Sequence, residues 1–133
     1  MNEILIFIIK YCSELYYKYG FRFINSDYCE GDNSIIVLEN GNVRFLFLRD
    51  RGQLMLEVSL SLNGKKSEQF SFELIRQYIS GESELFTILD DNNGAFIRDN
   101  LEKIVNLLSE NSVKTTILNL KKLEKRRSKL LFG

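Results

Sequence analysis

The apolar residues near the start of the chain recur every three or four positions, which is the period of an amphipathic helix. One stripe is formed by Ile4, Ile8, Tyr11 and Leu15. Gly20 follows this stripe, and glycine is common just after a helix because it adopts a left-handed backbone without strain. The pattern therefore predicts a helix over residues 2–19.

After Gly20 the apolar period changes to two residues, as in strands whose alternate side chains face opposite sides of a sheet. Alternating segments cover 21–28, 34–50 and 53–61. The dipeptide Asn40-Gly41 divides the second segment, and it suits a tight hairpin turn whose two central residues need positive φ. The pattern predicts an antiparallel meander of about four strands.

The charged stretch from Arg49 to Gln53 lies between two of these strands, and within it Asp50-Arg51-Gly52 has the composition of a three-residue hairpin loop. Its simplest interpretation is a solvated turn in which Asp50 bonds backbone amides and the arginines brace the sheet against acids of flanking helices. An alternative is that Arg49, Asp50 and Arg51 support phosphoryl chemistry. Nothing else in the sequence favours that alternative.

Helical spacing returns at Phe70 and continues to the end of the chain. Four helices are predicted, over residues 71–81, 83–94, 95–111 and 112–131. The second is short and ends in a polar loop, and Asn92 or Asn93 is expected to cap the third. Strands followed by helices indicate an α+β fold rather than a parallel α/β sheet. We predict a single domain over 1–133, with an N-terminal helix, the meander, and C-terminal helices packed on the sheet.

Several kinds of chemistry are excluded by what the chain lacks. It has no histidine, which removes Ser-His-Asp and Cys-His catalysis and histidine-ligated zinc. A calcium loop with Gly94 in sixth place would need carboxylates where Leu89 and Asn100 stand. Cys12 and Cys29 have no metal-ligand spacing, so we interpret them as reduced thiols, with Cys12 in the core. The expectation is a protein that is not an enzyme and needs no cofactor or metal.

The apolar run at the N-terminus does not fit a signal peptide or a membrane span. Glu3 stands where a signal would carry positive charge, and Lys10 ends the run after six apolar residues. A bilayer-spanning helix needs about 20 apolar residues. The prediction is a cytoplasmic protein with no membrane partner.

Charge is divided unevenly along a chain whose net charge is zero. From Lys114 onward seven basic residues accompany one acid, so this tail carries +6 and the preceding residues carry −6. The basic terminal helix suggests nucleic-acid binding, although a solvated helix face is the more ordinary interpretation. Between positions 82 and 103 the chain has instead six acids against two bases. These six acids are Glu82, Glu84, Asp90, Asp91, Asp99 and Glu102.

Three segments together resemble a known group of small bacterial proteins. They are "FLRDRGQL" at 47–54, "FELIRQYISGE" at 72–82 and "LKKLEKRRSKLLFG" at 120–133. The combination is similar to immunity proteins of contact-dependent growth inhibition and related polymorphic toxin systems. That resemblance implies a non-enzymatic cytoplasmic protein that binds and neutralises one cognate toxin domain, often a nuclease. It identifies no catalytic residues.

The resemblance gives the acidic 82–102 region a possible partner. A nuclease must present a basic face to its substrate, and carboxylates could occupy that face in place of phosphates. We therefore predict an immunity protein that occludes a toxin domain, with the six acids as candidate toxin-binding residues. The alternative is a nucleic-acid-binding module that uses the basic C-terminal helix. A third possibility is a structural subunit of another complex.

Overall fold

A computed structural model gives the fold, and it describes residues 2–28, 34–60, 68–81, 88–109 and 111–132. The helices are α1 (Asn2–Tyr11), α2 (Ser13–Tyr17), α3 (Phe72–Ser80), α4 (Asp91–Leu107) and α5 (Val113–Phe132). The strands are β1 (Arg22–Tyr28), β2 (Ser34–Asn40), β3 (Val43–Asp50), β4 (Gln53–Leu60) and β5 (Glu68–Ser71).

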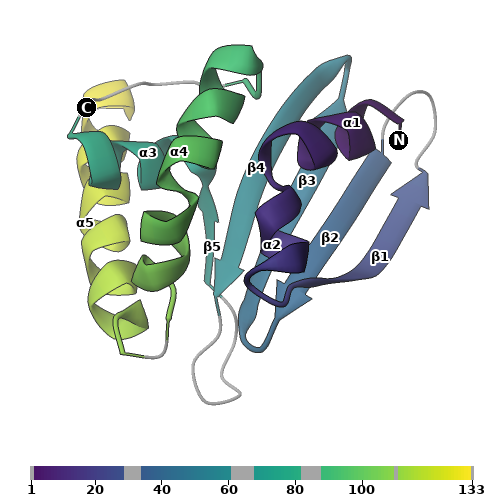
Figure 1. Ribbon diagram of the computed structural model, residues 1–133. Coiled ribbons are helices and arrows are strands. Elements are labelled where there is room, and N and C mark those ends of the chain that lie inside the picture. Colours follow the sequence, from purple (N-terminus) through teal and green to yellow (C-terminus); the bar gives the residue numbers. More distant parts are fainter. Residues whose placement is uncertain (1, 29–33, 61–67, 82–87, 110, 133) are drawn as a thin grey trace.

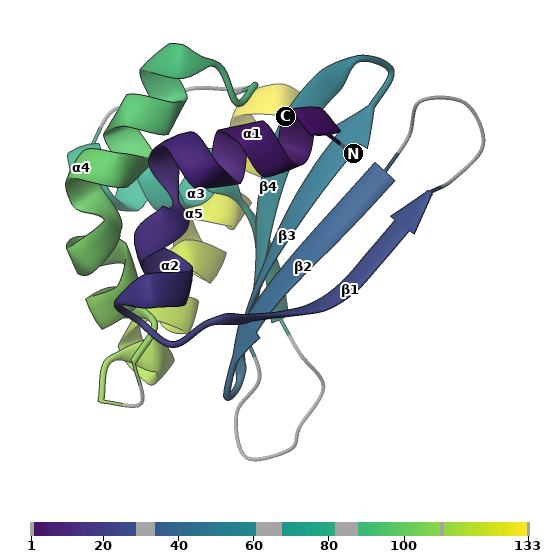
Figure 2. The same cartoon turned by 45° about the vertical axis from the view of Figure 1, so that its right-hand side comes forward.

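The predicted α+β class is confirmed. The strands form one antiparallel sheet in the order β1-β2-β3-β4-β5, so neighbours in the chain are neighbours in the sheet. Figure 1 shows α1 and α2 lying over the middle of this sheet, while α3, α4 and α5 form a second group next to β4 and β5. Figure 2 shows the same arrangement from a second direction, with β1 at the edge farthest from α5.

The prediction of one helix over residues 2–19 is wrong in one respect, because the chain bends at Cys12. Cys12 has φ −125° and ψ 12°, outside the helical range, and separates α1 from α2. Both Cys12 and Leu15 are only 1% exposed. Cys12 and Leu15 therefore both contribute to the core, on either side of the change in direction between α1 and α2.

The first hairpin turns one residue later than Asn40-Gly41 predicted. Asn40 pairs with Val43, so the central residues are Gly41 and Asn42, and of these only Gly41 has positive φ, at 58°. A glycine at the first central position is the requirement of a type II′ turn. Asn40 is used differently: its side-chain amide donates to the carbonyl of Tyr19, 2.8 Å away.

The charged stretch forms a two-residue turn, not the three-residue loop that its composition suggested. Asp50 pairs with Gln53, and both central residues are left-handed, with φ 53° at Arg51 and 78° at Gly52. Two left-handed residues define a type I′ turn, whose twist matches that of the strands. The interpretation as a turn is therefore confirmed, and its length is corrected.

The fifth strand was not predicted from sequence. β5 is four residues long and pairs with β4, placing Phe70 opposite Val58. So short a strand gives too few alternations to be recognised. The helix predicted at 71–81 is confirmed as α3, and it ends at Gly81 with φ 77°. Of the short helix predicted at 83–94, residues 82–87 lie outside the described residues.

Helix α4 begins four residues before the predicted start at 95, so the expectation that Asn92 or Asn93 caps it is wrong. The cap is Asp90, whose carboxylate accepts from the backbone N–H of Asn93 at 2.9 Å. Asparagines favour loops in general, but here a capping aspartate ahead of them lets the helix start earlier. The predicted helix at 112–131 is confirmed as α5.

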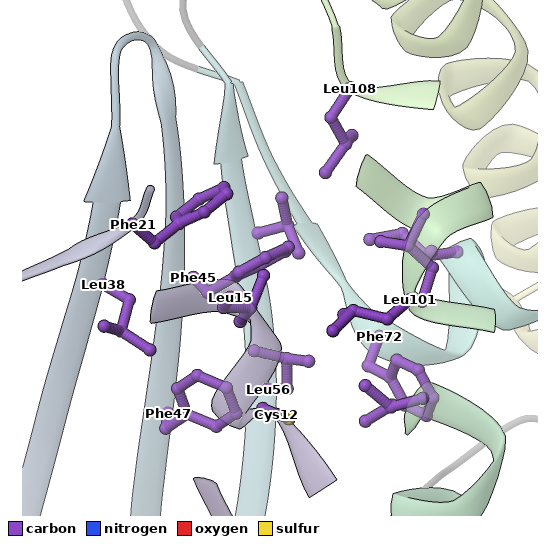
Figure 3. Close-up of a cluster of buried hydrophobic side chains, with 14 of the residues drawn as sticks. Cys12, Leu15, Phe21, Leu38, Phe45, Phe47, Leu56, Phe72, Leu101 and Leu108 are labelled. Atoms are coloured by element: carbon purple, nitrogen blue, oxygen red, sulfur yellow. The ribbon is translucent and has the colours of Figure 1, made fainter. Parts of the chain in front are cut away.

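The core lies between the sheet and the helices (Figure 3). Phe45 and Phe47 of β3, Phe72 of α3 and Leu101 of α4 point into it, each about 2% exposed or less. Cys12 is confirmed as a core residue, and burial raises the pKa of its thiol to about 12. The thiol therefore stays protonated and unreactive near neutral pH.

Candidate functional site

Most of the exposed large apolar side chains lie on the first three elements of the chain. In the described part of the chain seven large apolar residues are exposed, and six of them lie on α1, α2 and β1. We name these six the N-terminal apolar surface: Ile6, Ile9, Tyr16, Tyr17, Phe23 and Ile24. Tyr17 is 84% exposed and Ile9 is 70% exposed. Single exposed apolar residues are ordinary, but a group of this size is typical of an interaction site.

Helix geometry places two members of the surface on the outer side of α1. Ile4, Phe7 and Ile8 face the core and are buried. At 3.6 residues per turn, Ile6 and Ile9 fall on the opposite side. Helix α1 is therefore apolar on both faces. A surface helix needs apolar residues only on the face that packs on the core, so the outer apolar residues are available for another contact.

The aromatic members are held in a fixed cluster. The ring of Tyr16 lies 5.2 Å from that of Tyr17 and 6.0 Å from that of Phe23, measured between centroids. The guanidinium of Arg22 lies 4.5 Å from the Tyr16 ring and donates to the carbonyls of Tyr16 and Phe21 at 3.2 and 2.9 Å. These contacts join the rings of Tyr16, Tyr17 and Phe23 and the guanidinium of Arg22 into one aromatic cluster on the surface.

A β-bulge explains how two consecutive residues of β1 become exposed. Phe23 pairs with Leu38 and Asn25 pairs with Val37, so Ile24 is an extra residue in the ladder. Bulges redirect side chains and are common in edge strands, and β1 is at the edge of the sheet. Phe23 and Ile24 are consequently 49% and 44% exposed.

The sequence carried a signal for this surface that the prediction did not use. Ile6, Ile9 and Tyr17 are apolar residues off the buried stripe of the predicted N-terminal helix. The N-terminal apolar run was considered only as a possible signal peptide or membrane span. Only the fold shows that Phe23 of β1 packs against Tyr16 of α2.

The six predicted toxin-binding acids fall into three pairs. Glu82 and Glu84 lie outside the described residues. Asp90 and Asp91 begin α4 and hold the fold together. Asp99 and Glu102 lie two to three turns further along the same helix with exposed side chains.

Asp90 and Asn93 join α4 to α3. Besides capping the helix, Asp90 accepts from the Asn93 side-chain amide at 3.2 Å. Asn93 is only 6% exposed; its amide also donates to the carbonyl of Ile88 at 2.8 Å, and its oxygen accepts from Arg76 of α3. Asn93 was predicted only as a possible cap, and its buried role depends on tertiary contacts.

Asp91 joins α4 to α1. Its carboxylate accepts from the hydroxyl of Tyr11 at 2.5 Å and from the ammonium of Lys10 at 3.4 Å. The Tyr11 hydrogen bond, followed by Lys10, lowers the pKa of Asp91 below its ordinary value. Gly94, one turn on, leaves space for the Tyr11 ring, since a Cβ there would lie 2.5 Å from Cε2.

Asp99 and Glu102 border a shallow surface groove at the C-terminal half of α4. Asn100, Lys103 and Asn106 also line it. Asp99 accepts from its neighbour Arg98 at 3.3 Å in an exposed ion pair. The acidity of this face is therefore partly offset by basic side chains on the same helix.

An ion pair links the charged stretch to α1. Arg49 of β3 donates through Nε to Glu3 of α1 at 2.8 Å, and its side chain is 17% exposed. The expectation that an arginine of this stretch braces the sheet against an acid of a flanking helix is thus confirmed for Arg49.

The described ranges contain neither a metal-binding cluster nor a membrane-spanning helix. No group of three or more histidine, cysteine, aspartate or glutamate side chains there is arranged to hold a metal ion. Within the same ranges, no helix combines the length and apolar character that crossing a bilayer requires. No family model, curated protein or solved structure matches this chain.

Proposed function

We propose that this protein acts by binding another protein through the N-terminal apolar surface. In line with its resemblance to immunity proteins, the partner is a cognate toxin domain with nuclease activity. The toxin would be neutralised in the cytoplasm by occlusion, without turnover. The observation that carries the proposal is the gathering of six exposed apolar side chains on α1, α2 and β1.

The composition of this surface supports protein binding over other uses. Tyrosine and arginine are enriched among the residues that dominate interface energies. The surface has two tyrosines and a phenylalanine packed together, with Arg22 stacked on Tyr16. An aromatic side chain that enters a pocket on the partner contributes more than the flat contacts around it.

Asp99 and Glu102 supply the charge component of the proposal. Of the four predicted acids that the structure describes, Asp90 caps α4 and Asp91 bonds Tyr11 of α1. Asp99 and Glu102 have neither of these roles. Acids at the margin of an interface speed encounter with a basic partner more than they tighten the complex. We therefore assign them to steering.

The test expresses the reading frame immediately upstream of this gene as the candidate toxin domain, with binding measured by calorimetry and protection by growth of cells that express that domain. Ile9→Ser and Tyr17→Ser should each weaken binding by roughly 30-fold, about 2 kcal/mol. The matched control is Leu118→Ser, because Leu118 is 57% exposed but lies on α5. That variant should bind as the wild-type protein does.

Two outcomes would overturn parts of the proposal. Equal binding by the Ile9 and Tyr17 variants would show that the surface is wrong, and no binding by the wild-type protein would show that the function is wrong. Asp99→Lys combined with Glu102→Lys should slow association and leave dissociation unchanged. An unaltered association rate would remove the acidic residues from the proposal.

A further inference from the structure

Helix α5 carries a face of exposed positive charge, interrupted between Lys114 and Lys121 by the exposed apolar side chain of Leu118. We name it the basic stripe, and it consists of Lys114, Lys121, Lys122, Lys125, Arg126 and Lys129. With 3.6 residues per turn, these residues fall within an arc of roughly 140° and extend over about 22 Å of the helix. Val113, Ile117 and Leu120 face the other way and are buried. The stripe therefore points away from the body of the protein along four turns.

Little of this charge is neutralised within the described part of the chain. Lys121 forms an ion pair with Glu68 of β5 at 2.9 Å. No ion pair among the described residues involves the other five members of the stripe. Arg127 does pair with Glu73, at 3.4 Å, but it lies on the inner side of α5 and is outside the stripe.

The arrangement works against the stability of the isolated helix. Lys121 and Lys125, Lys125 and Lys129, and Lys122 and Arg126 are each separated by four positions, so they are neighbours on the helix surface and repel. The helix dipole favours cations only in the last turn. A bound anion that follows the helix would relieve this repulsion.

We propose that the basic stripe binds the phosphate backbone of double-stranded DNA without sequence preference. Binding to single strands relies on aromatic side chains that stack on bases, and the stripe has none. A helix 10–12 Å across matches the major groove of B-form DNA, about 12 Å wide, whereas that of A-form RNA is too narrow. Cations at both margins of the arc then reach phosphates of both strands.

This second site does not depend on the proposed toxin partner. The basic stripe is on α5, whereas the N-terminal apolar surface is on α1, α2 and β1. In Figure 1 α5 lies at the left edge of the molecule, apart from α1, α2 and β1. Each site is therefore tested by its own measurement.

The test measures fluorescence anisotropy of a labelled 20-base-pair DNA with the full chain, from 50 to 200 mM salt. Six phosphate contacts predict a slope of log K against log salt of about −5. The triple variant Lys122→Gln, Lys125→Gln, Lys129→Gln should reduce that slope by about 2.7 and weaken binding at 50 mM salt by about 3,000-fold. Glutamine keeps a good helix propensity, so the fold is retained.

The matched control removes the same charge elsewhere, as Lys18→Gln, Arg44→Gln, Lys103→Gln, and should leave the slope unchanged. An equal loss in this control, or no wild-type binding at 50 mM salt, would overturn the proposal. So would equal or better competition by an RNA duplex of the same sequence or by polyglutamate. None of these measurements uses the toxin domain, so their failure is distinct from failure of the proposed function.

Discussion

Gly94 of α4 leaves room for the ring of Tyr11, and alanine at this position would remove that room. Its backbone is helical, so in an open helix alanine would be favoured by up to about 1 kcal/mol. A Cβ at Gly94 would lie 2.5 Å from Cε2 and 2.7 Å from Cγ of Tyr11. Carbon atoms in contact normally stay 3.5–4.0 Å apart, so the ring or the helix must retreat by about 1 Å.

The ring has little freedom to retreat. Tyr11 is 6% exposed, packs on Phe7 with centroids 5.0 Å apart, and donates its hydroxyl to Asp91. Overpacking a core costs about 1–3 kcal/mol, and losing the hydrogen bond costs about 1 kcal/mol more. After the gain in helix propensity is subtracted, Gly94→Ala should lower the free energy of unfolding by about 2 kcal/mol.

Urea unfolding followed by far-UV circular dichroism measures this change, and the melting temperature should fall by roughly 6 °C. The control is the same substitution in a Tyr11→Leu background, where a smaller side chain leaves space for the new methyl group. There Gly94→Ala should cost less than about 0.5 kcal/mol. A Gly94→Ala protein as stable as the wild type, or an equal penalty in both backgrounds, would refute the reasoning.

Three further predictions concern buried or coupled polar groups. Asn93→Leu should lower the free energy of unfolding by about 2–3 kcal/mol, because it removes the hydrogen bonds of the buried Asn93 amide to Arg76, Ile88 and Asp90; a change below about 0.5 kcal/mol in urea unfolding would contradict this. Asp91 has a lowered pKa, so its contribution is present above the unfolded value of about 3.9 and disappears as the pH falls through the folded value. The stability difference between wild type and Asp91→Asn should therefore be larger at pH 6 than at pH 2, and a difference independent of pH would be evidence against this coupling. In a Cys29→Ser background, Cys12 should react with a thiol reagent at pH 8 only after unfolding, because burial raises its pKa to about 12; rapid labelling of the native protein would disprove its inaccessibility.

The spacing of apolar residues predicted the long helices and strands correctly. It failed where a side chain bonds a residue far away in the chain. The apolar face of α5 and the alternating apolar residues of β3 and β4 were predicted correctly, because each pattern repeats several times along the chain. The first hairpin was misplaced by one residue because Asn40 bonds the carbonyl of Tyr19, far away in the chain. The start of α4 was misplaced because its asparagines were assigned to a loop, whereas Asn93 bonds Arg76 across the fold.

The candidate sites follow the same division. The basic stripe was visible in the sequence as a charge excess, since a helix brings residues three and four apart to one face. The N-terminal apolar surface was not, because it joins side chains from α1, α2 and β1 through a bend at Cys12 and a bulge at Ile24. Neither irregularity has a local sequence signature.

By itself the sequence determined the α+β class, the antiparallel meander and the charge of the terminal helix, because short-range periodicity and composition carry that information. Only the tertiary structure decided which acids contact other elements of the fold. Asp91 and Asp99 are the same residue type and both are exposed, yet Asp91 bonds Tyr11 of α1 whereas Asp99 pairs with its neighbour Arg98. The physical reason is that the partners of Asp91, Lys10 and Tyr11, lie about eighty positions away in the chain. A local sequence pattern does not contain that information.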